Sequence, residues 1–233
     1  MARLIAALLR HGDYHQSPGV PSAHQPYPLT EEGERQALDV AAELHASISR
    51  DNRELVPAID SSHMLRAWQT ADIIASHLAG ATATEIRVVS HDVLAERSVG
   101  CAANLTTGEI ETVLAADPRV PAPPANWKAD SHYRLPLQGA ESLLEAGKRV
   151  AAHLSQAMAA LAQSDRDRLK IFVGHGAAFR HAAYHMGVLE FGDLRLLSMY
   201  HCRPVLLEYL PGGQWRHIGG DWKVREKHSE YTD

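Results

Sequence analysis

The sequence predicts an α/β fold, because apolar strands and amphipathic helices alternate along it. The first observation is an apolar run at residues 4–9, which ends abruptly in Arg10-His11-Gly12. The second is a β-branched and aromatic run at residues 170–173, which ends in Gly174-His175-Gly176 and leads into a helix. Ligands of open α/β sheets bind beyond the carboxyl ends of the strands. We therefore expect a binding site where these two strands end.

Composition is that of an ordinary soluble globular protein: of the 233 residues, 45% are hydrophobic and 22% are charged. This length allows a substantial core, and we expect a single domain over residues 1–233. The net charge of -5 speaks against nucleic-acid binding, and no apolar stretch approaches the roughly 20 residues that cross a bilayer. Two cysteines, Cys101 and Cys202, are too few for a disulfide framework or a zinc cluster, which favours a reducing cytoplasm.

The tripeptide after the first strand combines groups with a chemical use. Arg10 offers a planar, permanently charged fork that matches phosphate oxygens. His11 is a nucleophile when its reacting nitrogen is unprotonated and aimed at a substrate. Gly12 lets the backbone turn tightly and lets a ligand approach it. The alternative is a strand end with an incidental polar tip.

A loop and a helix are expected next. Four prolines and a glycine exclude regular helix at residues 13–28, and such a long loop is expected to border a binding site: Pro18, Gly19, Pro21, Pro26 and Pro28. Thr30 is the expected N-cap of the helix that follows, with Gly33 at the third position of a near capping box. The apolar stripe of this helix comprises Ala37, Leu38, Ala41, Ala42, Leu44 and Ile48.

The second strand is expected to end at residues 58–59 and to lead into a helix capped by Ser61 or Ser62. The apolar face of that helix comprises Leu65, Ile73, Ile74 and Leu78. Arg66 lies about one turn into the helix, near its positively polarised end, and an arginine at a helix N-terminus makes an anion site. The alternative for Arg66 is a surface ion pair with Asp60 or Asp72.

A third strand at residues 86–89 leads to Glu96, which is a candidate general acid if its site is partly buried. The alternative is a surface ion pair between Glu96 and Arg97. Residues 107–115 have helical character, and four prolines then mark an irregular excursion: Pro118, Pro121, Pro123 and Pro124. We expect residues 97–138 to form an insertion or cap over the site, and a helix to run from residue 138 to about residue 163.

The remaining third of the chain repeats the opening pattern and then becomes β. His175 lies between a strand end and a helix N-terminus, where backbone N–H groups bind phosphate oxygens. His181 and His185 are one helical turn apart, a spacing that would suit a metal, although no third ligand stands out. Residues 205–210 and 214–218 predict a hairpin, and residues 221–233 predict a polar tail.

These motifs together resemble the histidine phosphatase superfamily, in the branch that includes cofactor-dependent phosphoglycerate mutases. The resemblance covers the chain from Leu4 to about Gly219 and rests on the following residues in this order: Leu9-Arg10-His11-Gly12, Leu29-Thr30 with Gly33, Ser61 with Arg66-Ala67 and Gln69-Thr70, Glu96-Arg97, Gly139 with Glu141-Ser142, and Gly174-His175-Gly176. It implies a three-layer α/β/α sandwich around a mostly parallel sheet.

The resemblance also implies roles for residues that the patterns had already singled out. His11 would take the phosphoryl group as a phosphohistidine, and Glu96 would protonate the leaving oxygen and then activate water. Arg10, Arg66 and His175 would surround the transferring group, with the Gly176 N–H as a further donor. Neither a metal nor another cofactor is implied.

Departures from the mutases favour a phosphatase. Where the mutases carry Ser and Asn after the nucleophile, this chain has Tyr14 and Ser17, which we expect in the substrate site, and Val99 replaces a Tyr. The adjacent arginine pair of the mutase cap has no counterpart among Lys128 and Arg134. We predict hydrolysis of a small phosphomonoester; Tyr14-His15 resembles a subgroup that acts on phosphoproteins. The alternatives are a mutase, a non-catalytic phosphate-binding module and a metal-dependent hydrolase.

Overall fold

A mixed β-sheet is the middle layer of the protein in the computed structural model, which describes residues 2–21, 24–162 and 165–225. Seven strands of the described residues form it: β1 (Leu4–Arg10), β2 (Glu54–Leu55), β3 (Ala58–Ser62), β4 (Arg87–His91), β5 (Arg168–Gly174), β7 (Val205–Tyr209) and β8 (Trp215–Gly219). The main order is β4-β3-β5-β1-β7-β8, and β2 pairs with β5. Strands β1 to β5 run parallel to one another, whereas β7 pairs antiparallel with β1 and β8 pairs antiparallel with β7.

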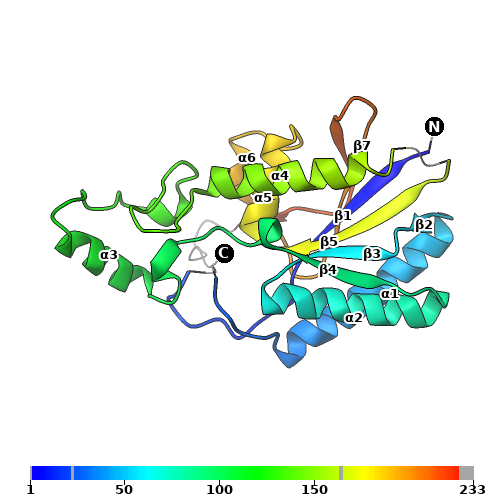
Figure 1. Cartoon of the computed structure of the whole chain (residues 1–233), viewed down its shortest axis with the longest axis horizontal. Helices are drawn as coiled ribbons and strands as arrows, with labels where there is room; N and C mark the ends of the chain where they lie inside the picture. Colours follow the sequence, from blue (N-terminus) through cyan, green and yellow to red (C-terminus); the bar gives the residue numbers. More distant parts are fainter. Residues whose placement is uncertain (1, 22–23, 163–164, 226–233) are drawn as a thin grey trace.

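Helices cover both faces of the sheet (Figure 1). One face packs against α1 (Glu31–Arg50) and α2 (Leu65–Thr82), and the other packs against α4 (Leu143–Ala159) and α5 (Gly176–His185). The pleat of β1 explains both cores, since Ile5, Ala7 and Leu9 point to the first face while Leu4, Ala6 and Leu8 point to the second. A strand buried on both faces reads as a continuous apolar run, as residues 4–9 do. The expected α/β/α architecture is confirmed.

A third apolar cluster lies in the segment that was expected to form a cap. It comprises Val99, Ala102, Ile110, Leu114, Trp127, Leu135 and Ala140. The helix α3 (Thr107–Ala116) and the short turns η2 (Gly100–Ala102) and η3 (Trp127–Ala129) carry part of it. Figure 1 shows α3 at one end of the molecule, away from the sheet. The description of the whole chain as one domain stays a prediction.

The helix starts follow the capping signals with one exception. Thr30 is the N-cap of α1, where its side chain accepts a hydrogen bond from the Gly33 N–H, as expected. The α4 cap is Ser142, which forms a capping box with Glu145, so this helix begins later than residue 138. The prediction that Ser61 or Ser62 caps α2 is wrong, because the N-cap is Met64. Ser62 instead accepts the Met64 N–H from inside β3, which continues three residues beyond the expected end at residue 59.

The shortest elements had no local signal. They are η1 (Asp92–Leu94), α6 (Asp193–Leu196), β6 (Leu197–Ser198) and β9 (Lys223–Val224). The strands β6 and β9 pair antiparallel, so part of the predicted tail is structured, while residues 226–233 lie outside the described residues. In the part of the chain that the structure describes, no helix has the length and hydropathy needed to cross a membrane.

Candidate active site

The register of two parallel strands brings the two glycine-flanked histidines together. In the pairing of β1 with β5, Arg10 lies opposite Gly174. The His11 N–H then donates to the Gly174 carbonyl over 3.0 Å, which continues the pairing one residue beyond β1. The rings of His11 and His175 lie 5.1 Å apart between centroids. The two repeats of the sequence pattern therefore form one site at the carboxyl edge of the sheet.

Hydrogen bonds fix the protonation of the His11 ring. Nδ1 lies 2.7 Å from the Gly12 carbonyl, which only accepts, so Nδ1 carries the proton. Nε2 accepts from the Arg66 Nε–H over 3.0 Å, so it presents a lone pair. Burial and then the positive charge of Arg66 lower the pKa of His11 well below its usual value. The ring is a neutral imidazole whose Nε2 is available as a nucleophile once Arg66 turns away.

Arg66, Arg10 and His175 enclose this nitrogen. The Arg66 side chain is fully buried, and its guanidinium also donates to the Gln25 carbonyl and to Nδ1 of His175, over 3.0 and 3.3 Å. The other His175 nitrogen, Nε2, therefore bears the proton and donates to Ser62 Oγ over 2.9 Å. Burial, followed by the charge of Arg66, lowers the pKa of His175 well below its usual value. Two guanidinium groups beside two neutral imidazoles make a site with net positive charge, suited to an anion.

The other sequence candidates lie at different places around His11. The Tyr14 ring packs edge-on against His11 with 5.2 Å between centroids, and the Arg66 guanidinium lies 4.4 Å over it. Gly176 begins α5, where an added Cβ would lie 3.2 Å from Arg10 Cδ, so a side chain here would press on that arginine. Ser17 belongs to the loop, and its N–H donates to Gln25 Oε1 over 3.3 Å. In the described contacts, nothing joins Ser17 to His11.

Glu96 is a buried carboxyl group, contrary to the alternative of a surface ion pair. Its Oε1 accepts the Arg97 backbone N–H over 2.8 Å, and its Oε2 accepts the Ala177 N–H over 3.2 Å. The second bond attaches it to the first turn of α5, two residues after His175. Burial lowers the pKa of Arg10, and the nearby Glu96 carboxylate partly offsets this lowering. Glu96 thus lies beside the cationic pocket.

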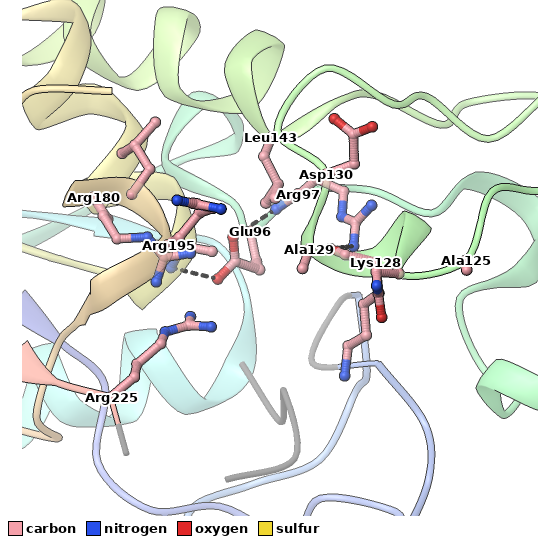
Figure 2. A pocket seen from close by; sticks show the side chains of 13 residues that line it. Glu96, Arg97, Ala125, Lys128, Ala129, Asp130, Leu143, Arg180, Arg195 and Arg225 are labelled. Atoms are coloured by element: carbon pink, nitrogen blue, oxygen red, sulfur yellow. Dashed lines mark hydrogen bonds between the residues drawn. The ribbon is translucent and has the colours of Figure 1, made fainter. Parts of the chain in front are cut away.

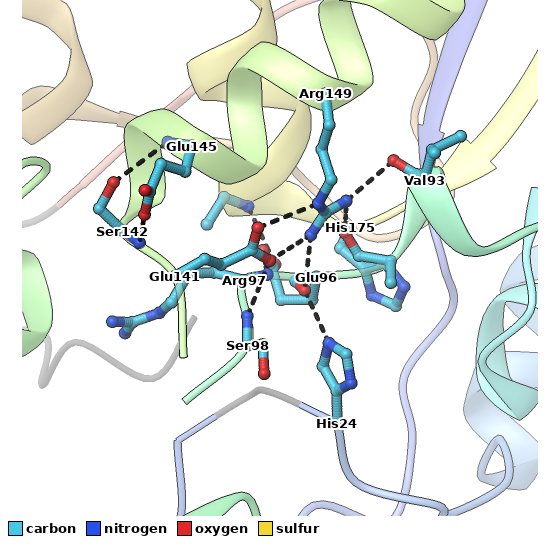
Figure 3. A network of polar contacts seen from close by, with 12 residues as sticks. His24, Val93, Glu96, Arg97, Ser98, Glu141, Ser142, Glu145, Arg149 and His175 are labelled. Carbon is cyan, nitrogen blue, oxygen red and sulfur yellow. Dashed lines mark hydrogen bonds and ion pairs between the residues drawn. The ribbon is translucent and has the colours of Figure 1, made fainter. Parts of the chain in front are cut away.

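A network around Arg149 holds the segment that carries Glu96 (Figure 3). Arg149 of α4 donates to the carbonyls of Val93, Ala95 and Glu96 over 2.8, 2.8 and 3.0 Å. Its guanidinium also pairs with the Glu141 carboxylate, which accepts the Ser98 N–H. Arg149 holds the backbone up to Glu96, and Glu141 holds the backbone after it, so both are positioning residues for Glu96. The sequence motif contained Glu141 but gave no reason to single out Arg149.

A cavity of about 380 Å³ opens from Glu96 (Figure 2). Its wall includes Ala177 as well as Glu96, so it adjoins the first turn of α5. The charged side chains that line it are five cations and two carboxylates: Arg97, Lys128, Arg180, Arg195, Arg225, Glu96 and Asp130. These come from residues 96–130, from α5 and α6, and from the residue after β9. The sequence patterns singled out Arg97 and Lys128 but not the three later arginines.

Two further residues lie close to the nucleophile segment: His201, which had no sequence signal, and Thr70, which belongs to the family motif but had no role assigned to it. His201 lies with its ring 5.6 Å from that of His11, and burial followed by the charge of Arg10 lowers its pKa to about 3. Thr70 accepts the Gly12 N–H over 3.1 Å and so fixes the turn after β1. His201 lies in the segment before β7, and β7 pairs with β1. A parallel bridge between Arg10 and His201, next to the Cys202 N–H that donates to the Arg10 carbonyl over 2.9 Å, brings His201 to the site.

The structure does not bring His181 and His185 into a group of possible metal ligands among the described residues, but it does form such a group elsewhere. The two ring nitrogens of His181 already contact the Ala177 carbonyl and Ser131 Oγ, over 2.8 and 3.0 Å. Among the described residues, one group has ligand atoms that all lie within 4.8 Å of one another: Asp60, His91 and His153. Asp60 also pairs with Lys170 Nζ over 2.7 Å. Burial alone would raise the pKa of Asp60, but hydrogen bonds from His153 and Lys170 outweigh it and lower the pKa. None of these side chains is among those that contact His11.

Comparison with known proteins gives a family and a set of structural relatives. The model of the histidine phosphatase superfamily, branch 1, matches residues 6–218. No curated protein matches the sequence. A mycobacterial glucosyl-3-phosphoglycerate phosphatase is 22% identical with a TM-score of 0.67, and the match covers 96% of this chain and 97% of that one. A phosphoglycerate mutase from Bacillus anthracis is 15% identical with a TM-score of 0.70, covering 93% and 92%. These structures share the fold of this chain.

Proposed function

The chain belongs to the histidine phosphatase superfamily, branch 1, and from this membership we propose that it hydrolyses phosphomonoesters through a phosphohistidine on His11. The observation that carries the proposal is the state of the His11 ring. Nδ1 keeps its proton at the Gly12 carbonyl, and burial holds the imidazole neutral. A nucleophile must be unprotonated at the atom that attacks, and this arrangement meets that condition at Nε2.

In the first step, His11 Nε2 attacks phosphorus and the bond from phosphorus to the alcohol oxygen breaks. Glu96, protonated at one carboxyl oxygen, gives its proton to that oxygen, so the alcohol leaves neutral. Arg66 leaves the His11 lone pair and turns its N–H groups to the phosphoryl oxygens, together with Arg10 and His175. Phosphoryl transfer depends mainly on such positioning and on stabilisation of spread negative charge.

In the second step, a water molecule attacks the phosphorus of phosphohistidine and the N–P bond breaks. Glu96, now a carboxylate, takes a proton from this water, which restores the acid for the next cycle. The products are inorganic phosphate and a neutral His11. We propose that no metal takes part, because the guanidinium groups of Arg10 and Arg66 supply the positive charge at the transferring group.

The test is hydrolysis of p-nitrophenyl phosphate, with chelator present throughout, by the wild type, His11→Ala and His15→Ala. His15 is exposed and lies four residues from the nucleophile, so it is the matched control. We expect His11→Ala to lose all activity above background and His15→Ala to keep it. Treatment of the phosphorylated protein with acid and with alkali identifies the intermediate, because phosphohistidine survives alkali and is hydrolysed by acid. Undiminished activity in His11→Ala would remove the nucleophile assignment.

A phosphatase is preferred to a mutase because of the residues near the site. Val99 stands where the mutases have a Tyr. It is fully buried in the third apolar cluster and so does not face a substrate. Phosphorus NMR of 3-phosphoglycerate separates the two reactions, since hydrolysis gives inorganic phosphate and transfer gives a second phosphoglycerate. Release of phosphate alone is the expected result. The cavity of about 380 Å³ beside Glu96 suits part of a small-molecule substrate.

Two further outcomes are built into this assay series. If the wild type releases phosphate from neither small esters nor phosphopeptides, the chain is a phosphate-binding module. Activity on phosphopeptides alone would identify a phosphoprotein as the partner. We propose a cytoplasmic location, because Cys101 and Cys202 are both free thiols, the usual state of cysteine in a reducing compartment.

A further inference from the structure

The cavity beside Glu96 carries more positive charge than phosphoryl transfer needs. Its lining has five cations and two carboxylates. Both carboxylates already accept backbone N–H groups: Glu96 from Arg97 and Ala177, and Asp130 from His132 over 2.8 Å. The cations point into the same space from several elements (Figure 2). A cleft lined by one sign of charge concentrates ligands of the opposite sign.

Arg97 gives a second, independent indication that this cavity binds an anionic ligand. Its side chain is buried, with only 5% of the residue exposed, and its Nη1 has no hydrogen-bond partner among the described residues. Its guanidinium lies 5.8 Å from the Trp127 ring, and Nη2 lies 3.5 Å from the Lys128 carbonyl. A buried cationic donor without a partner is costly unless an acceptor reaches it. An anionic group in the cavity would supply that acceptor.

The position of Glu96 says which part of a substrate enters the cavity. A general acid must lie within hydrogen-bond reach of the oxygen that it protonates. Under the proposed function, that oxygen belongs to the alcohol that leaves. Because Glu96 forms part of the cavity wall, the rest of the alcohol extends into the cavity and meets the cations there.

We propose that the substrate is a phosphomonoester whose alcohol carries a second anionic group, held by Arg195, Arg225 and Nη1 of Arg97. This inference rests on the proposed phosphatase function. Arg195 lies on α6, and Arg225 follows β9 and donates its Nε–H to the Leu197 carbonyl over 3.0 Å. That bond ties Arg225 to the strand that follows α6, so the two arginines form one wall. An arginine fork matches either a carboxylate or a phosphate.

The experiment compares matched substrates that differ in one anionic group. For a carboxylate, the pair is 3-phosphoglycerate and glycerol 3-phosphate; for a phosphate, it is 1,3-propanediol bisphosphate and the corresponding monophosphate. We expect kcat/KM to be at least about tenfold higher for the anionic member of one pair, as charge-assisted hydrogen bonds imply. The pair that discriminates identifies the second group as carboxylate or phosphate.

The variants Arg195→Gln and Arg225→Gln then test the residues. For the pair that discriminates, we expect each substitution to lower the ratio of the two kcat/KM values by about tenfold, so that it approaches one. Arg119→Gln is the matched control, since Arg119 is an exposed cap arginine paired with Asp117, and it should keep the wild-type ratio.

Failure of this inference and failure of the proposed function give different results. Equal kcat/KM within both pairs, in an enzyme that hydrolyses p-nitrophenyl phosphate, overturns the second anion site and leaves the phosphatase assignment intact. A high ratio that survives in both variants overturns the assignment to Arg195 and Arg225. No hydrolysis of any substrate removes both proposals together.

Discussion

Individual side chains at this site are defined by their hydrogen bonds more than by their types. His11 and His175 are both neutral imidazoles, but they keep their protons on different nitrogens. Arg66 sets this difference, because its guanidinium donates to Nε2 of one ring and to Nδ1 of the other. A single buried arginine therefore orients both histidines. A sequence motif identifies these residues, but it does not give their tautomers.

Replacement of Glu96 by Gln should separate the two steps of the reaction. Gln keeps an oxygen acceptor for the Ala177 N–H but has no proton to give or take. We expect a burst of p-nitrophenolate equal to one per enzyme, because this leaving group needs no proton, followed by a steady-state rate lower by ~10²–10⁴. Stopped-flow absorbance measures both phases. A steady-state rate equal to that of the wild type would show that Glu96 is not the base.

The sequence identified the residues that carry a local pattern and missed those that do not. Arg10, His11 and His175 stand at strand ends, and Arg66 stands at a helix start, which are positions that a pattern reveals. His201 reaches the site through its bridge with Arg10, and Arg225 reaches the cavity through the pairing of β9 with β6. Long-range pairing of this kind leaves no mark in the residues nearby.

Among the elements, α5 has the closest connection to the chemistry. It begins directly after His175, gives the Ala177 N–H to Glu96, and contributes Arg180 to the cavity. Its place is set by α4, which approaches it at Gly147, where any side chain would meet the Cβ and backbone of His181. The two helices pack in contact because this residue has no side chain.

The substitution Gly147→Ala tests this contact. The added methyl group has no room against His181, so α5 must shift, and we expect the free energy of unfolding to fall by about 1–3 kcal/mol. A shift of α5 also moves Ala177 and His175, so kcat should fall. Urea denaturation and p-nitrophenyl phosphate hydrolysis are the two measurements.

Gly80→Ala is the matched control for Gly147→Ala. Gly80 is also in a helix, α2, but its added Cβ would meet nothing within 4 Å. This substitution should raise the free energy of unfolding by up to about 1 kcal/mol, which is the difference in helix propensity. Equal effects of the two substitutions would show that the contact between α4 and α5 does not depend on Gly147.

The sequence predicted the long elements well and the two-residue strands not at all. The helix α1 begins after Thr30 as expected, because its cap bond is local. The strands β2, β6 and β9 exist only through their partners, so no periodicity can reveal them. The wrong cap of α2 has a similar origin, since pairing with β4 extends β3 through Ser62.

The part of the molecule that the structure describes keeps four histidines neutral: His11, His175 and His181, which are buried, and His201, which is partly buried. In each, burial is the main reason that the pKa lies below its usual value, and for His181 and His201 it falls to about 3. On unfolding, these rings regain an ordinary pKa near 6.5. The unfolded chain therefore binds more protons than the native protein at mildly acid pH.

Stability should consequently fall as the pH drops below about 6.5, because the unfolded state takes up protons there and the native state does not. Between pH 7.5 and 5.5, each histidine contributes a loss of roughly 1.4 kcal/mol. The measurement is the free energy of unfolding by urea across this range. Its slope against pH between 5.5 and 6 should correspond to the uptake of nearly four protons on unfolding. His201→Asn should lower the slope by one proton. A flat profile would show that these rings are protonated in the native protein.

The place of β1 in the sheet also determines when the protein can fold during its synthesis. Among the strands of this sheet, β1 comes first in the sequence, yet its neighbours are β5 and β7, which begin at Arg168 and Val205. During synthesis, this apolar strand from the middle of the sheet cannot pair until β5 and β7 have been made. Contacts of such long separation form slowly and leave apolar surface exposed meanwhile. We therefore expect residues 4–9 to stay without their sheet partners until β5 and β7 have been made.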